Sequence, residues 1–361
     1  FTALFAQMDD LTVGSILLHS QTNDLPSEVD LTKLVDAFRD KRLVFLGEAT
    51  HGDGTALKLK NRLINYLIKE HGFDIVLFER NIYEMDVMMR FLAQEGSHKG
   101  YILQEGFRNM HRISMGIGDL MSSFERMFLQ KSFLRIGGVD PLYYSRYGDC
   151  LEKDLVDAGV KTNLIRNYMR SLKELMVLQD CYSCSPDYFS TYRNSYSNRF
   201  DEETKKILQS LYLSQRIDSL RRNFLILILK HNIDLLNWLK DRGSLPDNPS
   251  SNQLLEFFAG RDKIMFGNLL WYLQNYPNSR IIVSASTYHV TRGISRYKTM
   301  VDYLPDSIHA KAGYFPVVYY EGSHGYIEGR YYDVDSVKRS KGSIEYMLSS
   351  KGFNYAFLKF K

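Results

Sequence analysis

Four motifs that often reveal an enzyme class are missing from this chain. There is no P-loop, no G-x-G-x-x-G, no G-x-S-x-G and no H-E-x-x-H. Interpretations as an NTP-binding protein, a dinucleotide-dependent enzyme, a serine hydrolase or a zinc protease therefore lose their usual support.

Long apolar runs and a charge excess are missing as well. No stretch of about 18 consecutive apolar residues occurs, so the sequence predicts no membrane span. The 46 Lys and Arg residues against 42 Asp and Glu residues leave a formal net charge of only +4 over 361 residues. That excess is too small to indicate a nucleic-acid or membrane-surface partner.

Cysteine is scarce. Cys181 and Cys184 form a lone C-x-x-C, and Cys150 is the third cysteine. A structural zinc site needs four ligands and no second pair follows, so we expect ordinary thiols, which could form a disulfide in an exported protein. Residues 1–7 are apolar, end in small residues and resemble the end of a signal peptide. They favour an exported, periplasmic protein, with a cytoplasmic one as the alternative.

The patterning that is present predicts an α/β fold. Apolar residues make up 44% and charged residues 24% of the chain, as in globular proteins. Short β-branched apolar runs alternate with long helical patterns, which indicates a mostly parallel central sheet flanked by helices. The candidate strands are 43–46, 75–78, 134–139, 280–285, 315–320 and 355–360.

The middle of the chain reads as almost entirely helical. Helical patterns cover 162–180 and a longer run, 201–242, after an earlier helix over 55–70 that Gly72 can end. We expect an α/β core formed by 25–148 and 260–361, with a helical insertion over 149–259 roofing the carboxyl ends of the strands. Because a helix of this length joins the first two strands, they are expected to be parallel neighbours.

An acid and a histidine follow the first strand. The segment Gly47-Glu48-Ala49-Thr50-His51-Gly52 places Glu48 and His51 at the lip of the sheet. A neutral imidazole there can take a proton from water, and a carboxylate can orient it. Alternatively, Glu48 caps the following helix and His51 is a hydrogen-bonded loop residue.

Charged residues also follow the other strands. If the strands are neighbours, Glu79 converges with Glu48 and His51, which pushes their pKa values apart as acid–base chemistry requires. Alternatively, Glu79 forms a buried ion pair with Lys60 or Arg80. Two further residues each allow two interpretations. Asp140 is either a site residue or the cap of the next turn. His289 is either a second acid–base residue or a hydrogen-bonded histidine at the strand end.

Taken together, these segments resemble the erythromycin esterase family over roughly 29 to 361. The resemblance rests on 47–52, Lys60, Gly72-Phe73, Glu79, 138–140, 261–265, the strand ending at His289, and 342–345. It implies an α/β core with a helical part over a deep cleft, and hydrolysis of a macrolide lactone by a histidine acting on water without a required metal. By position, His51 is that base, Glu48 and Glu79 are its neighbours, His289 is the second histidine, and Lys60 replaces a basic residue that is often Arg.

One departure concerns the fourth strand end. The family usually reads Ala-His-Asn-x-His where this chain has Ala285-Ser286-Thr287-Tyr288-His289. Ser286 cannot titrate near neutral pH, so any role that needs an imidazole at that position is lost. The departure puts activity on macrolides in question.

The sequence therefore predicts a hydrolase that cleaves an ester or lactone of a hydrophobic small molecule without a cofactor. The expected catalytic residues are His51, Glu48, Glu79 and His289, and the expected substrate-binding residues are Lys60, Arg80, Asp140, Tyr288 and Arg261. One alternative is a metal-dependent hydrolase with the four catalytic residues as ligands. Another is a small-molecule-binding protein on a degenerate enzyme scaffold, which Ser286 and the tyrosine-rich helical segment would favour.

Overall fold

The structure is a computed structural model of the chain. It describes residues 14–18, 31–32, 35–36, 38–48, 51, 54–108, 117–129, 134–180, 186–243, 250–292, 297–317, 324–327, 330–333 and 355–359. The expectations for residues 1–7, for Cys181 and Cys184, and for 342–345 lie outside these ranges.

A five-stranded, entirely parallel sheet forms the centre of the protein. Every residue of β2 and β5 is buried, which confirms the predicted α/β class with strands covered on both faces. The sheet order is β4-β3-β5-β2-β6. Its strands are β2 (Leu43–Glu48), β3 (Ile75–Asn81), β4 (Arg135–Asp140), β5 (Ile281–Ser286) and β6 (Ala312–Val317).

Two antiparallel strand pairs lie apart from this sheet. The closing strand over 355–359 therefore pairs outside the main sheet, with a strand near the N-terminus. The pairs are β1 (Gly14–Leu18) with β9 (Tyr355–Lys359), and β7 (His324–Ile327) with β8 (Arg330–Asp333).

The expected pairing of the first two strands is wrong. β5 lies between β2 and β3, so Val283 pairs with Phe45 on one side and with Leu77 on the other. All three strands are buried and apolar, so their local patterns do not distinguish which of them are neighbours. A strand that follows about 200 residues later occupies the gap.

Helices cover the sheet, and the first of them begins and ends close to the predicted positions. In α2, Gly72 has a φ of +66° and follows the last helical residue, while the Phe73 N–H donates to the Leu67 carbonyl at 3.2 Å. The helices of the first half are α2 (Gly54–His71), α3 (Ile82–Leu92), α4 (Lys99–Gly106) and α6 (Ile117–Leu129).

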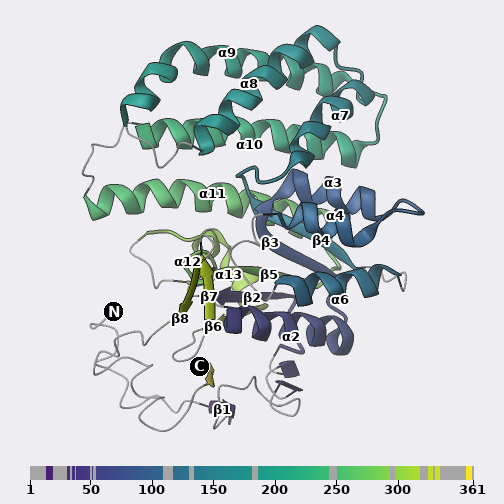
Figure 1. The fold of residues 1–361 in the computed structure, drawn as a ribbon, viewed down its shortest axis with the longest axis vertical. Coiled ribbons are helices and arrows are strands. Elements are labelled where there is room, and N and C mark those ends of the chain that lie inside the picture. The colour runs from purple at the N-terminus through teal and green to yellow at the C-terminus, as the bar shows by residue number, and fades with distance from the viewer. Residues whose placement is uncertain are drawn as a thin grey trace.

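The middle of the chain is helical, as expected. In Figure 1, α11 lies between the sheet and the stacked helices α7 to α10. The helices are α7 (Leu151–Asp157), α8 (Thr162–Asp180), α9 (Pro186–Leu213), α10 (Ser219–Gly243) and α11 (Ser251–Asn275). Because α11 runs unbroken through 259 and 260, the border predicted there falls inside one helix, and the division into core and insertion stays a prediction.

The single helix expected over 201–242 is wrong, because the chain breaks between α9 and α10. Asp218 caps the second helix by accepting from the Arg221 N–H at 2.8 Å, and the Ser214 hydroxyl donates to the Ala158 carbonyl. No Pro or Gly marks this break, so hydrophobic periodicity alone passes through it. The Asp218 cap is the local signal that indicates the second start.

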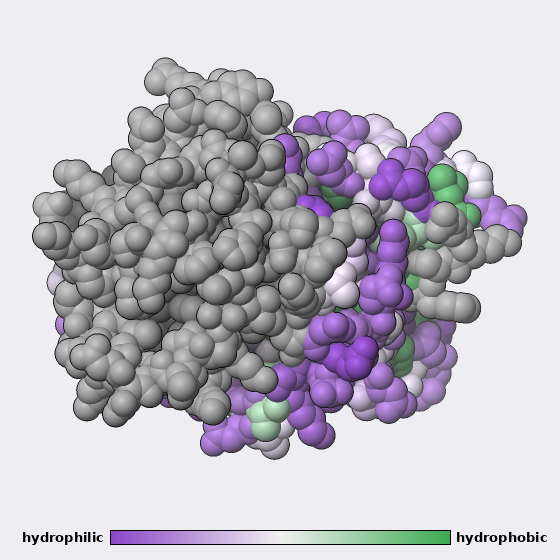
Figure 2. Space-filling view, turned by 90° about the horizontal axis from the view of Figure 1, so that it is seen from below, coloured by the Kyte–Doolittle hydropathy of each residue, from purple (hydrophilic) through white to green (hydrophobic). Residues whose placement is uncertain are grey.

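Short helical segments complete the described fold. They are η2 (Arg146–Cys150), α12 (Thr287–Val290), η3 (Met300–Tyr303) and α13 (Asp306–His309). Within the described residues, no helix is long and apolar enough to cross a bilayer. The coloured part of the face in Figure 2 is largely hydrophilic.

β3 contains a bulge near its carboxyl end. The β3–β4 register shifts between Phe78 and Asn81, so Glu79 and Arg80 stand opposite a shorter stretch of β4. Gly138 makes room for this bulge, because a Cβ atom there would lie 2.1 Å from the Arg80 carbonyl oxygen. The bulge therefore depends on a glycine in the neighbouring strand.

Gly138→Ala is expected to lower the free energy of unfolding by about 2–3 kcal/mol, since the backbone of β3 must move. Urea unfolding measures this change. Gly118→Ala is the matched control, because nothing lies within 4 Å of the added methyl group. The control should be neutral or slightly stabilising, and an equal loss in both variants would contradict the packing argument.

Candidate active site

The strand ends bring acidic and imidazole groups together at one edge of the sheet. Glu48 ends β2, Glu79 lies in the bulge of β3, Asp140 ends β4, and Ser286 ends β5. Parallel strands present their carboxyl ends on the same edge, so these residues converge although their sequence separations are large.

Glu48 is buried and both of its carboxylate oxygens have partners. Oε1 lies 3.0 Å from Nδ1 of His51, and Oε2 accepts a hydrogen bond from the buried ammonium of Lys60. Burial alone would raise the pKa of Glu48, but the charge of Lys60 and the hydrogen bond to His51 together hold it below its ordinary value. Glu48 is therefore an ionised group that orients His51 rather than a helix cap.

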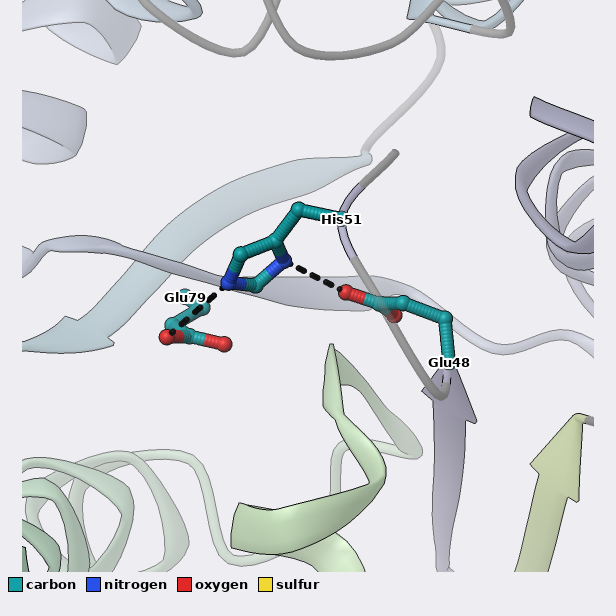
Figure 3. Close-up of side chains that lie close together, drawn as sticks. All are labelled: Glu48, His51 and Glu79. Atoms are coloured by element: carbon teal, nitrogen blue, oxygen red, sulfur yellow. Dashed lines mark hydrogen bonds and ion pairs between the residues drawn. The ribbon is translucent and has the colours of Figure 1, made fainter. Parts of the chain in front are cut away.

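His51 lies between the two glutamates, as Figure 3 shows. Its side chain is 51% exposed, and its Nε2 is 3.8 Å from Oε1 of Glu79. The hydrogen bond to Glu48 raises its pKa, burial opposes this, and the charge of Glu79 adds to the rise. When His51 is neutral and donates its Nδ1–H to Glu48, the unprotonated Nε2 is open to water.

Glu79 has three hydrogen-bonding neighbours from other elements. Oε1 accepts from Nη2 of Arg261 at 2.9 Å and lies 3.3 Å from Nε2 of His289, while Oε2 accepts from the backbone N–H of Ser286 at 3.0 Å. Burial opposes ionisation, but the charges of His289 and Arg261 lower its pKa well below the ordinary value. The shortest ion-pair contacts of Glu79 are with these two residues, and His51 lies farther away at 3.8 Å. The ion pair with Lys60 or Arg80 that was the alternative from the sequence is not formed, since Lys60 pairs with Glu48 and Arg80 binds the Gly106 carbonyl.

His289 is buried between two carboxylates. Its Nδ1 lies 2.9 Å and 3.1 Å from the two oxygens of Asp262, on α11. Burial disfavours the charged imidazole, but the charges of Glu79 and Asp262 raise its pKa to about 10. The two carboxylates therefore favour the charged form of His289.

Asp140 and Arg261 form the outer part of the same cluster. Arg261 donates from Nε and Nη2 to the two oxygens of Asp140, at 3.0 Å and 2.6 Å, and the Tyr144 hydroxyl donates to the second oxygen at 2.5 Å. Nη1 of Arg261 has no hydrogen-bond partner among the residues that the structure describes, and the side chain is 15% exposed. It is the one edge of this guanidinium left for a ligand.

Two predicted substrate-binding residues, Arg80 and Tyr288, form no hydrogen bond with the carboxylates of this cluster in the described part of the chain. Arg80 is buried, donates from Nε and Nη2 to the Gly106 carbonyl, and stacks 4.4 Å over the Tyr144 ring. Tyr288 is 63% exposed beside His289. The Ser286 hydroxyl caps α12 by accepting from the Tyr288 N–H at 3.4 Å.

The charges of the cluster explain why His51 is poised to take a proton. Four carboxylates, of Glu48, Glu79, Asp140 and Asp262, face three cations, of Lys60, Arg261 and His289. With His51 neutral the cluster therefore holds one excess negative charge, which a proton on His51 balances. The hydrogen bond to Glu48 is the largest cause of the raised pKa of His51, and the charges of Glu79 and Glu48 add to it.

A metal ion fits this arrangement poorly. Glu48, His51 and Glu79 each offer a ligand atom within 4.8 Å of one another. However, the carboxylates already have partners. Lys60 pairs with Glu48. Arg261 and the Ser286 N–H donate to Glu79, and His289 forms an ion pair with it. A divalent cation would have to displace protonated groups that already neutralise these carboxylates, and a doubly protonated His289 cannot ligate.

Comparisons with known proteins agree on the fold. A structure of the erythromycin esterase EreC, a histidine-to-asparagine mutant in its open conformation, matches with a TM-score of 0.60 at 14% identity, over 92% of this chain and 86% of that one. The chain has the fold of an erythromycin esterase. A solved succinoglycan biosynthesis protein matches with a TM-score of 0.66 at 15% identity, over 93% of this chain and 81% of the other.

One curated protein is similar to this chain in sequence. YbfO of Bacillus subtilis (strain 168), which is provisionally named a hydrolase, is 24% identical over 345 residues, covering 84% of this chain and 71% of YbfO. No protein-family model matches the chain. The chain therefore has the fold of an erythromycin esterase and one distant sequence relative that is named a hydrolase.

Asp262 is the site residue that sequence reasoning missed. It lies in the segment 261–265 that contributes to the resemblance, yet neither its spacing nor its neighbours point to His289, which is 27 positions away. The available signal is a pair of opposite charges, Arg261 and Asp262, in the middle of a long and otherwise mainly apolar helix.

Lys60→Met is expected to lower the free energy of unfolding by about 3–5 kcal/mol, because it leaves a buried carboxylate without its cation. Adding Glu48→Gln should restore more than half of the loss, since the uncompensated charge is then removed. Urea unfolding measures both changes. Lys58→Met, on the exposed side of the same helix, should stay within about 0.5 kcal/mol of the parent. If Lys60→Met lowered the free energy of unfolding no more than Lys58→Met does, the stabilising role of the buried Lys60–Glu48 pair would be contradicted.

Proposed function

We propose that this protein is a hydrolase that cleaves an ester or lactone with a water molecule activated by His51. The observation that carries the proposal is the half-exposed imidazole whose Nδ1 is held by Glu48 and whose Nε2 lies beside Glu79. A base in this position is oriented and partly open to solvent, and the hydrogen bond to Glu48 raises its pKa.

The reaction follows from these positions. Nε2 of His51 takes a proton from water as the water oxygen bonds to the carbonyl carbon of the substrate. The resulting imidazolium is stabilised by Glu48 and Glu79, the carboxylates on either side. When the tetrahedral intermediate collapses and the C–O bond to the leaving alkoxide breaks, the same proton passes from His51 to that oxygen.

The oxyanion needs a donor that is not already engaged. Lys60 and His289 are buried and bound to carboxylates, so neither is the favoured donor. The open Nη1 edge of Arg261 is the favoured donor. The N-terminus of α2, which begins at Gly54 three residues after His51, adds a favourable dipole.

The proposed substrate is a hydrophobic small molecule with an ester or lactone bond, and macrolides are the first class to test. The support is the fold shared with erythromycin esterase, together with α11, which brings Arg261 to the strand ends. In this proposal 149–259 covers the cleft, and the exposed Tyr288 ring contacts the substrate at its edge. No metal takes part in the proposed reaction.

His51→Gln is expected to abolish hydrolysis, by roughly 10³-fold or more, because the imidazole assigned as the base is removed. The measurement is the gain of one water by mass over a panel of macrolides and simpler lactones, with and without a chelator. His98→Gln, an exposed histidine at the start of α4, is the matched control and should keep full activity. Full turnover by His51→Gln would refute the assignment, and binding without turnover by the parent would favour a binding protein.

The plot of kcat/KM against pH should fall on its acidic side, because His51 must lose its proton to act as a base. Since its pKa is raised above the ordinary 6.5, kcat/KM should increase with pH to a plateau with a midpoint above 6.5. Glu48→Gln removes the largest cause of that rise. It should move the limb to lower pH and reduce the plateau roughly tenfold or more. A limb that does not move would contradict the assigned hydrogen bond.

A further inference from the structure

Both ring nitrogens of His289 lie within hydrogen-bond distance of a buried carboxylate. Nδ1 faces Asp262 at 2.9 Å and 3.1 Å, and Nε2 faces Glu79 at 3.3 Å. His51 differs, since its Nε2 is 3.8 Å from Glu79 and its side chain is half exposed. The two histidines of the site are thus held in different ways.

The chemistry of imidazole decides what this placement requires. A neutral ring has one N–H donor and one lone pair, so one nitrogen of a neutral His289 would direct its lone pair at a carboxylate. In a buried position that contact is repulsive, and it removes one of the donors of that carboxylate. Only the doubly protonated ring satisfies both neighbours, and the two carboxylates supply its countercharge.

Asp262 is itself held in place. It is fully buried on α11, and its Oδ1 also accepts from the backbone N–H of Met300, the first residue of η3, at 2.7 Å. The preceding residue, Arg261, donates to Glu79 from the same turn of the helix. One turn of α11 therefore contacts Glu79 directly and also through His289.

We infer that Asp262 is a positioning residue that keeps His289 doubly protonated, and that His289 in turn keeps Glu79 ionised and aimed at His51. His289 then exchanges no proton during turnover, and His51 is the only histidine of the pair that does. The effect on turnover rests on the proposed function, whereas the protonation state of His289 does not.

The other ionisable groups around His289 do not obscure its titration. Burial raises the pKa of the Tyr297 and Tyr303 hydroxyls, which lie near Asp262, so both stay neutral below pH 10. The further groups are Arg261 from α11, Glu79 from β3, His51 from the loop after β2, and the adjacent Tyr288. His51 is the other histidine near His289, and its signals can be identified with His51→Gln.

The direct test is ¹⁵N NMR of the histidine side chains in the full chain, with His289 assigned by His289→Gln. Both ring nitrogens of His289 should keep imidazolium shifts through pH 8. Asp262→Asn keeps an acceptor for Met300 but removes the charge, so the titration should move down by about one pH unit or more. Asp262→Glu keeps the charge, so the titration of His289 should return most of the way to its position in the parent protein. A neutral His289 at pH 8 in the parent, or no shift in Asp262→Asn, would overturn the inference.

Turnover provides the second readout. Asp262→Asn should lower kcat roughly 10- to 100-fold with little change in KM, and add an alkaline limb as the weakened His289 loses its proton. The matched control is Asp302→Asn. The Asp302 carboxylate lies on η3 and accepts from the N–H of Thr299, the residue before this helix. This control should add no such limb. If the parent cleaves no tested ester, the proposed function fails, but the NMR result still decides the role of Asp262. An alkaline limb in the control as well would overturn that role.

Discussion

The site depends on one buried carboxylate, that of Glu79. It accepts hydrogen bonds from α11 through Arg261 and from β5 through the Ser286 N–H, and it faces His289. A buried carboxylate is stable only when such partners surround it. The burial of Glu79 therefore requires β3, α11 and the end of β5 to pack together. The bulge that turns Glu79 out of the β3 ladder makes this meeting possible.

This requirement also accounts for the distribution of charge. The cations at the site are bound to carboxylates that could not otherwise be buried, and together they leave one negative charge for His51 to balance. Such a network is oriented before substrate arrives, which avoids reorganisation during the reaction. The same bonds link stability to chemistry, because removing one member leaves a neighbouring buried charge with fewer partners.

Much of the fold was predictable because burial and periodicity are local properties. The strands of the sheet and α2 follow from apolar patterning, and Gly72 ends α2 where a left-handed residue is needed. Strand order was not predictable, because β2, β3 and β5 are all buried and apolar. The break between α9 and α10 was missed because hydrophobic periodicity continues through it.

The sequence by itself determined which side chains stand at the strand ends: Glu48 and His51 after one strand, Glu79 and His289 after two others. Only the tertiary structure decided their partners, and so their protonation. Glu79 reaches His51 although β5 separates their strands, and Asp262 makes His289 a cation instead of a base. The physical reason is that charge pairing acts through space over a few ångströms, and distance along the chain does not encode it.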